Sequence, residues 1–232
     1  MKKILFCMMF CILQAYDIKE NIIKTFKDED IDVKVILVEK LNSGLGIAII
    51  EQINGIQIPV FVTNDGHNVM GISEPLILSN QTYQDIMRSV YKKAMEHNKK
   101  HTDMLLMQKV NANMWITLNG DAKKASVYLV LDANCRYCKQ EILKIEEMLK
   151  DYKEVKILFC GLLGADSLQK AAKVYKDITR LKNQNEKIDF LKSVFDSGFV
   201  VNEKIDTKTI ESLSEIIIQA GVTGVPYIII ND

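Results

Sequence analysis

The first eighty residues carry one helix-like run followed by several short β-like runs. From Tyr16 to Phe26, apolar residues recur at helical spacing. Asn54-Gly55, between two of the later runs, is a strong hairpin signal. A helix followed by about five antiparallel strands predicts a small α+β domain over residues 16–79, and pairing with a second copy would stabilise a domain that buries so little surface. We expect strands at Val33–Leu41, Leu45–Ile50, Ile56–Thr63, His67–Ile72 and Leu76–Ser79.

A long helix-like segment follows this domain. It starts near Asn80. One face carries a narrow apolar stripe, and the other faces are rich in lysine. A narrow apolar stripe on a charged helix is typical of a connector, so we assign residues 80–108 to a linker helix. Whether Met104–Met107 continues this helix or turns into the next domain stays open. The stripe consists of Tyr83, Ile86, Val90 and Met95.

Beyond residue 109, short apolar runs alternate with helix-like runs, which predicts an α/β domain over residues 109–232. Asp166-Ser167 is expected to cap one helix, and Gly221 to end another. The expected strands are Trp115–Leu118, Ser126–Leu131, Val155–Phe159 and Tyr227–Ile230. The expected helices are Lys139–Lys150, Asp166–Leu181, Lys187–Phe195 and Thr207–Ala220.

Composition narrows the class of protein. The chain has 232 residues and 48% hydrophobic residues, enough for a sizeable core and too many for a disordered chain. Lys and Arg number 30 and Asp and Glu number 30, so the balance of charge gives no indication of binding to nucleic acid or to an anionic membrane.

The first fifteen residues have the pattern of a secretion signal. Lys2 and Lys3 precede the apolar stretch Ile4–Leu13, and Ala15 offers a small residue for cleavage. This stretch is shorter than the roughly 20 residues that span a bilayer. We therefore expect residues 1–15 to be a cleavable signal peptide, the alternatives being an uncleaved anchor or a buried first strand.

Removal of this signal would leave Cys135, Cys138 and Cys160. An exported chain of this length with so few cysteines does not depend on a disulfide framework for stability. The pair Cys135-Arg136-Tyr137-Cys138 lies between a strand-like and a helix-like run, and Val225-Pro226 precedes a late strand. That combination is typical of the thioredoxin fold.

A thiol at the start of a helix faces unpaired N–H groups, which stabilise its thiolate. We therefore predict that Cys135 is the attacking thiolate and Cys138 the resolving thiol. Arg136 would lower the pKa of Cys135 further or is an ordinary exposed residue, and Tyr137 is expected to face the substrate. Pro226 is predicted to be cis, with its bond presenting the Val225 backbone to substrate.

Two other interpretations of these residues stay open. Half of a zinc site would need further ligands, for which Cys160 and a pair of histidines at helical spacing, His97 and His101, are candidates. We favour a solvated histidine pair and expect no metal or other cofactor. Cys160 is expected to be a buried structural thiol, the alternative being a redox-sensitive thiol near the site.

Taken together, the chain resembles the bacterial periplasmic disulfide isomerases DsbC and DsbG. The most specific part of the resemblance is Asp132-Ala133-Asn134-Cys135-Arg136-Tyr137-Cys138, with the Tyr before the second Cys; Gly66-His67 and Gly71–Leu76 resemble segments of their dimerisation domain. The resemblance implies a cystatin-like α+β dimerisation domain, a linker helix and a thioredoxin-like catalytic domain with a helical insertion. It also implies a periplasmic homodimer that reshuffles wrong disulfides in exported proteins and is kept reduced by a membrane donor of the DsbD type.

Two departures keep other functions open. The isomerases usually carry Thr before the cis-proline, where this chain has Val225, as DsbA-type oxidases do. The printed sequence also stops at Asn231-Asp232, where a thioredoxin domain continues through a further strand and helix. The alternatives are therefore a dimeric DsbA-like thiol oxidase, and a chaperone that binds unfolded chains without redox turnover.

Overall fold

The computed structural model describes residues 18–41, 44–71, 77–121 and 125–231. The predicted signal peptide and most of the predicted segment Gly71–Leu76 lie outside these residues. The chain divides into two compact units, residues 1–101 and 102–232, and the long helix α2 (Gln81–Lys109) runs through the boundary. This helix therefore continues past His101 through Met104–Met107. Among the described residues, none of the helices combines the length and apolar character needed to cross a membrane.

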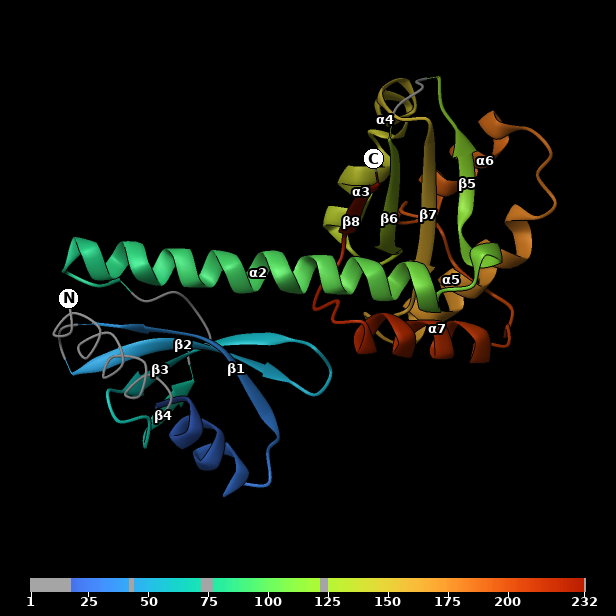
Figure 1. Cartoon of the computed structure of the whole chain (residues 1–232). Coiled ribbons are helices and arrows are strands. Elements are labelled where there is room, and N and C mark those ends of the chain that lie inside the picture. The colour runs from blue at the N-terminus through green and yellow to red at the C-terminus, as the bar shows by residue number, and fades with distance from the viewer. Residues whose placement is uncertain (1–17, 42–43, 72–76, 122–124, 232) are drawn as a thin grey trace, which may run out of the picture. The chain divides into compact units, whose positions relative to one another are not determined.

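The first unit is built on an antiparallel meander, β1 (Val33–Lys40), β2 (Leu45–Gln52), β3 (Gln57–Thr63) and β4 (Val69–Gly71). Alternate side chains of a strand point to opposite faces, and a helix packs against each face of β2, so both of its faces are buried. Ile47 and Ile49 pack with α2, whereas Ala48 and Ile50 pack with the helix at residues 18–27 (Figure 1).

One expected strand in this unit is wrong. Of Leu76–Ser79, the described residues 77–79 are not a strand. The Leu78 N–H donates instead to Oε1 of Gln84 on α2, at 2.6 Å, so its backbone bond goes to a helix side chain rather than to a neighbouring strand. The remaining strands lie close to their predicted bounds.

The second unit has a mixed four-stranded sheet in the order β5-β7-β6-β8. The strands are β5 (Ile116–Asn119), β6 (Ser126–Asp132), β7 (Glu154–Cys160) and β8 (Tyr227–Asn231). β6 and β7 are parallel, and β5 and β8 run antiparallel to their neighbours.

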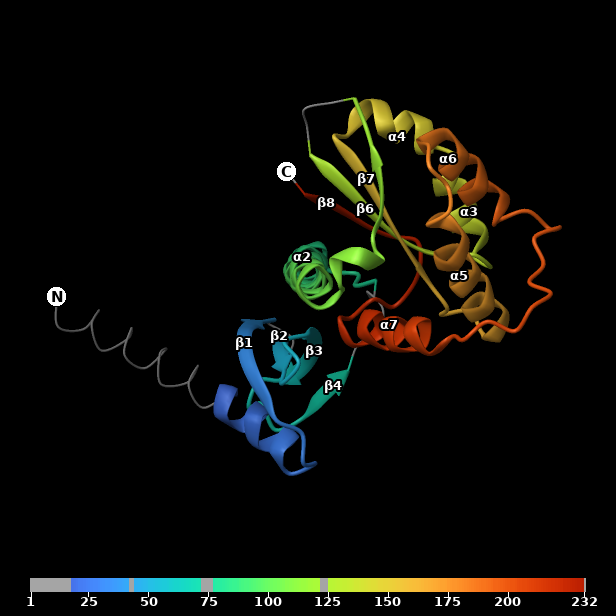
Figure 2. The same ribbon diagram turned by 90° about the vertical axis from the view of Figure 1, so that its right-hand side faces the viewer.

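Helices cover both faces of this second sheet. The helices are α3 (Arg136–Ile142), α4 (Ile145–Asp151), α5 (Ala165–Ile178), α6 (Gln184–Ser193) and α7 (Lys208–Gln219), after a 3-10 turn at Ala112–Met114. Leu129 and Leu131 of β6 face the core shared with α3 to α6, which Figure 2 shows on one side of the sheet. Tyr128 and Val130 face the core formed with α7 and the end of α2. The expected fold class, a small α+β domain and a thioredoxin-like domain with a helical insertion, is confirmed.

Two local predictions in this unit are wrong. The expected single helix Lys139–Lys150 is divided into α3 and α4, because the chain leaves helical geometry at Lys144 (φ −90°, ψ 7°). Helix α5 is capped by Gly164, with φ 107°, and not by Asp166 or Ser167. The side chains of these two residues bind the turn before Cys135 instead, as described below.

The hairpin between β2 and β3 depends on Gly55. This residue has φ +83°, and a Cβ there would lie 2.7 Å from the ring of His101. The ring can move aside only by giving up its 2.9 Å contact with the Asn54 carbonyl oxygen. We therefore expect Gly55→Ala to lower the free energy of unfolding by the roughly 1–2 kcal/mol of left-handed backbone strain and, in addition, by the loss of this contact. Urea denaturation measures the difference. Gly44→Ala is the matched control, since Gly44 has φ +82° and open space around it. Equal losses in the two variants would contradict the proposed clash.

Candidate functional site

The site forms where three strands of the second unit meet. The carboxyl ends of the parallel strands β6 and β7 lie side by side, with Asp132 opposite Cys160. The start of β8 lies at the same edge, because Tyr227 pairs with Val130. This register brings the segment after β6, which carries the two cysteines, against the segment before β8, which carries Val225 and Pro226.

The two cysteines occupy different surroundings. Cys135 is the N-cap residue of α3, and its thiol donates to the carbonyl oxygen of Val225 at 3.2 Å. Cys138, one turn further along α3, is 0% exposed. Its sulfur accepts from the N–H of Asp132 at 3.5 Å. Both side chains are free thiols in this structure.

Burial makes the Cys138 thiol a weak acid. Loss of contact with water raises the pKa of the Cys138 thiol far above its ordinary value, and contact with Cys135 adds to the rise, whereas the Asp132 N–H opposes it. Since the thiolate is the reactive form, this burial lowers the reactivity of Cys138 as long as α3 stays packed.

The Val225–Pro226 peptide bond is cis, as predicted. Val225 and Pro226 are both half-buried. The Val225 carbonyl that accepts from Cys135 therefore belongs to the segment expected to meet the substrate.

Arg136 and Tyr137 are exposed and contact each other. The guanidinium carbon lies 4.6 Å from the centre of the Tyr137 ring, and the guanidinium also donates to the Tyr137 hydroxyl. Tyr137 is 50% exposed, which leaves an aromatic surface beside the two cysteines. Their roles in lowering the pKa of Cys135 and in facing the substrate stay predictions.

A hollow of about 630 Å³ opens beside Cys135. All its lining residues are uncharged, and most are apolar or glycine. Leu163 and Ile218 are large apolar residues more than half exposed. Sequence reasoning missed this surface, because its walls come from segments far apart in the chain. The lining residues are Cys135, Leu162, Leu163, Ile218, Gly221, Val222, Thr223, Gly224 and Val225.

Cys160 lies on the other face of the sheet. It is 0% exposed and packs in the core with α7, whereas Cys135 and Cys138 belong to the core with α3 to α6. Its thiol donates to the Leu131 carbonyl at 3.3 Å. Burial and the nearby charge of Asp132 raise the pKa of Cys160 to about 12. These surroundings favour a structural thiol.

The two histidines considered as zinc ligands belong to the first unit. Nε2 of His97 lies 3.0 Å from the Gly55 carbonyl oxygen, and Nε2 of His101 lies 2.9 Å from that of Asn54. Their rings stack on each other and hold the β2–β3 turn. Within the described part of the chain, no group of three or more His, Cys, Asp and Glu side chains is placed to hold a metal ion.

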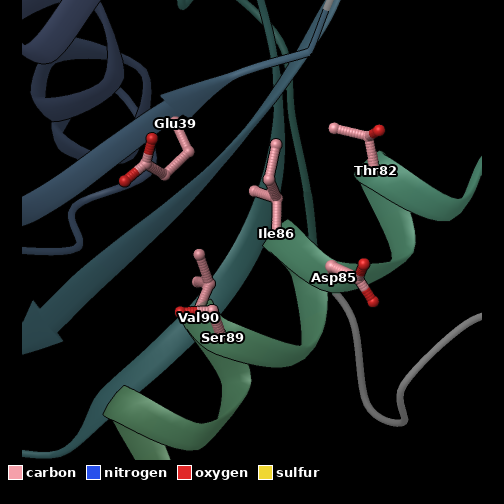
Figure 3. Close-up of a pocket in the computed structure, with 6 residues that line it drawn as sticks. All are labelled: Glu39, Thr82, Asp85, Ile86, Ser89 and Val90. Atoms are coloured by element: carbon pink, nitrogen blue, oxygen red, sulfur yellow. The ribbon is translucent and has the colours of Figure 1, made fainter.

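A second hollow, of about 350 Å³, lies in the first unit between β1 and α2 (Figure 3). Ile86 and Val90 point from α2 toward the strand, and Glu39 and Asp85 add carboxylates at its margin. It contains no thiol, so it offers none of the chemistry of the cysteine site.

The difference in surroundings predicts which thiol reacts first. At pH 8, iodoacetamide should modify Cys135 in the native protein and spare Cys138 and Cys160, because both are fully buried and their raised pKa values leave little thiolate. Mass spectrometry of peptide digests measures the order of modification. Urea should make all three react, and modification of native Cys160 as fast as Cys135 would contradict the structure.

Comparisons with known proteins agree with this architecture. Residues 20–106 match the family model described as disulfide isomerase DsbG N-terminal. The structure of Helicobacter pylori DsbG is 22% identical, and the match covers 91% of this chain and 99% of that one, with a TM-score of 0.53. A linker-deletion mutant of Proteus mirabilis ScsC is 15% identical, with 68% and 88% coverage and a TM-score of 0.48. The Wolbachia pipientis thiol-disulfide exchange protein α-DsbA2 is 17% identical, with 57% and 86% coverage and a TM-score of 0.43.

No curated protein sequence matches the chain significantly. The H. pylori DsbG comparison shows a common fold, and the family match covers the N-terminal part of the chain. Residues 20–106 thus match the DsbG N-terminal family model, and the chain as a whole is similar in fold to H. pylori DsbG.

Proposed function

We propose that this protein is a thiol–disulfide oxidoreductase that reduces and reshuffles wrong disulfides in exported proteins. The observation that carries the proposal is the contact of the Cys135 thiol with the Val225 carbonyl, at the edge of an uncharged hollow. The reaction uses the two thiols and the substrate disulfide, without a further cofactor. The N-terminal signal pattern supports action in the periplasm.

In the first step the Cys135 thiolate attacks one sulfur of a substrate disulfide. A mixed disulfide forms between Cys135 and the substrate, and the other substrate sulfur leaves as a thiolate. A different thiolate of the substrate can then attack the substrate sulfur of the mixed disulfide, which forms a new substrate disulfide and releases the Cys135 thiolate. Attack by the freed thiolate itself would only re-form the original disulfide. Alternatively Cys138 attacks Cys135, which releases a reduced substrate and leaves a Cys135–Cys138 disulfide.

The burial of Cys138 supports isomerisation over net reduction. Its raised pKa keeps it protonated, so the second route is slowed and the mixed disulfide lasts longer. The substrate then has time to rearrange. Each time Cys138 resolves the mixed disulfide, the pair becomes a Cys135–Cys138 disulfide. A dithiol donor of the DsbD type would then return two electrons to the pair.

Val225 is the feature that favours the second candidate, a DsbA-like thiol oxidase. In that function the Cys135–Cys138 disulfide would be transferred to a reduced substrate, which would leave both cysteines reduced. The two functions use the same site and differ in which form of the pair is the more stable.

Cysteine variants separate these functions. We expect Cys135→Ala to abolish the reactivation of a scrambled disulfide protein, and Cys138→Ala to retain much of it while losing net reduction of a disulfide substrate. Cys160→Ala is the control and should keep both activities, since Cys160 lies on the other face of the sheet. Rapid oxidation of reduced substrate by the disulfide form, with no reshuffling by the dithiol form, would favour the oxidase. Suppression of aggregation by Cys135→Ala, with no exchange activity in the wild type, would favour the chaperone.

We also propose that the protein is a homodimer joined through its N-terminal region, which the match of residues 20–106 supports. Light scattering should then give a mass about twice that of the mature chain. The mature chain itself is somewhat lighter than the full sequence of 26.4 kDa, because the signal peptide is removed. A single-chain mass at micromolar concentration would contradict the dimer and leave the redox proposal standing.

A further inference from the structure

Asp132 ends the apolar strand β6 with a carboxylate that is 0% exposed. A buried carboxylate is costly unless hydrogen-bond donors replace the water that it has lost. In this protein four donors do so, all within 3.0 Å of its two oxygens. Such complete pairing suggests that Asp132 organises the segments that supply the donors.

The donors come from three separate segments. One carboxylate oxygen accepts from the Asn134 N–H at 2.9 Å and from the Ser167 hydroxyl at 2.7 Å. The other accepts from the N–H groups of Leu162 and Leu163 at 2.8 and 3.0 Å. Asp132 therefore binds the turn before Cys135, the first turn of α5 and the turn after β7.

Two of these segments, the turn before Cys135 and the turn after β7, also lie at the hollow beside Cys135. Cys135 follows directly on the Asn134 turn, and Leu162 and Leu163 form a wall of the same hollow. Moving either turn would change the distance between the reactive sulfur and that wall. At the surface, the Asn134 amide also donates to the Asp166 carboxylate on α5, at 3.0 Å. Exposed contacts of this kind contribute little to stability.

We propose that Asp132 is a positioning residue that holds Cys135 and the Leu162–Leu163 wall in one fixed arrangement, so that a polypeptide seated against this wall presents its disulfide to the Cys135 sulfur. The inference rests on the proposed function, because it concerns the approach of a disulfide substrate. It adds a role for the side chain of Asp132, whose hydrogen bonds go to Asn134, Leu162, Leu163 and Ser167 and not to either sulfur of the pair.

Asp132→Asn tests the idea with almost no change in shape. An amide has one acceptor oxygen and one NH₂ group, whereas all four partners of Asp132 are donors. If the oxygen stays with Leu162 and Leu163, the NH₂ faces the Asn134 N–H, and that bond is lost. If the amide turns round, the two leucine N–H groups lose their partner.

The experiment measures the rate of reduction of two disulfides by the reduced protein, well below its melting temperature. One is a peptide disulfide flanked by leucines, and the other is glutathione disulfide, which is too small to need the wall. We expect Asp132→Asn to slow the peptide reaction about ten- to hundredfold, as for a misplaced reacting group, and to change the glutathione reaction less than about threefold. Circular dichroism checks that the variant is folded.

Two serine variants complete the test. Ser214→Ala is the matched control, since the Ser214 hydroxyl accepts from the Gly161 N–H at 3.0 Å and holds the same turn without touching Asp132. Ser167→Ala removes one of the four donors to Asp132. We expect Ser167→Ala to slow the peptide reaction more than Ser214→Ala, a comparison that remains available if Asp132→Asn does not fold.

The outcomes separate the inference from the function on which it rests. A folded Asp132→Asn protein with wild-type rates on both disulfides would overturn the positioning role, as would an equal loss on both. If Asp132→Asn does not fold, equal rates in the two serine variants would overturn it. A wild-type protein that reduces neither disulfide would instead overturn the proposed function.

Discussion

The site depends on the register of three strands. Parallel pairing of β6 with β7 and antiparallel pairing of β6 with β8 place Cys135 beside a carbonyl ninety positions away in the sequence. Neither α3 nor the Val225–Pro226 segment could make this contact alone. The cores on both faces of the sheet hold the strands in place, so the packing of α3 to α7 is also what positions the reactive sulfur.

The same packing makes the two cysteines of the pair unequal. Cys135 lies at the edge of an uncharged hollow, and Cys138 lies under the helix with a raised pKa. Under the proposed function, such a pair would offer the Cys135 sulfur at the hollow to a substrate and delay the reaction of Cys138. Cys160 occurs one strand away, yet it points to the opposite face, where its thiol is bonded to Leu131. The direction in which each side chain leaves the strand or helix therefore places Cys160 in a different core from Cys135 and Cys138.

Much of this architecture could be predicted from the pattern of the sequence. The strands Ser126–Leu131 and Tyr227–Ile230, the hairpin at Asn54-Gly55 and the end of α7 at Gly221 follow from local residue preferences. The cis bond at Pro226 follows from the motif that pairs a late Val-Pro with the two cysteines. Local reasoning was misleading where a tertiary contact replaced a local one. Asp166 and Ser167 have the residue types of a helix cap, but their side chains bind Asn134 and Asp132.

The contribution of Asp132 could not be derived from sequence, although one signal was present. A carboxylate that ends a strand as apolar as Val127–Leu131 is unusual, but two of its four donors are backbone groups about thirty residues away in the sequence. Backbone donors leave no trace in residue identity. The same holds for the hollow, whose walls come from three separate segments.

The equilibrium reduction potential of the Cys135–Cys138 pair against glutathione distinguishes the isomerase function from the oxidase function. A pair that reduces and reshuffles disulfides should form a reversible two-electron couple with a potential clearly more negative than the roughly −120 mV of DsbA. A potential near that of DsbA would contradict the isomerase function and favour the oxidase. If no reversible couple formed, the pair would not be a working redox centre.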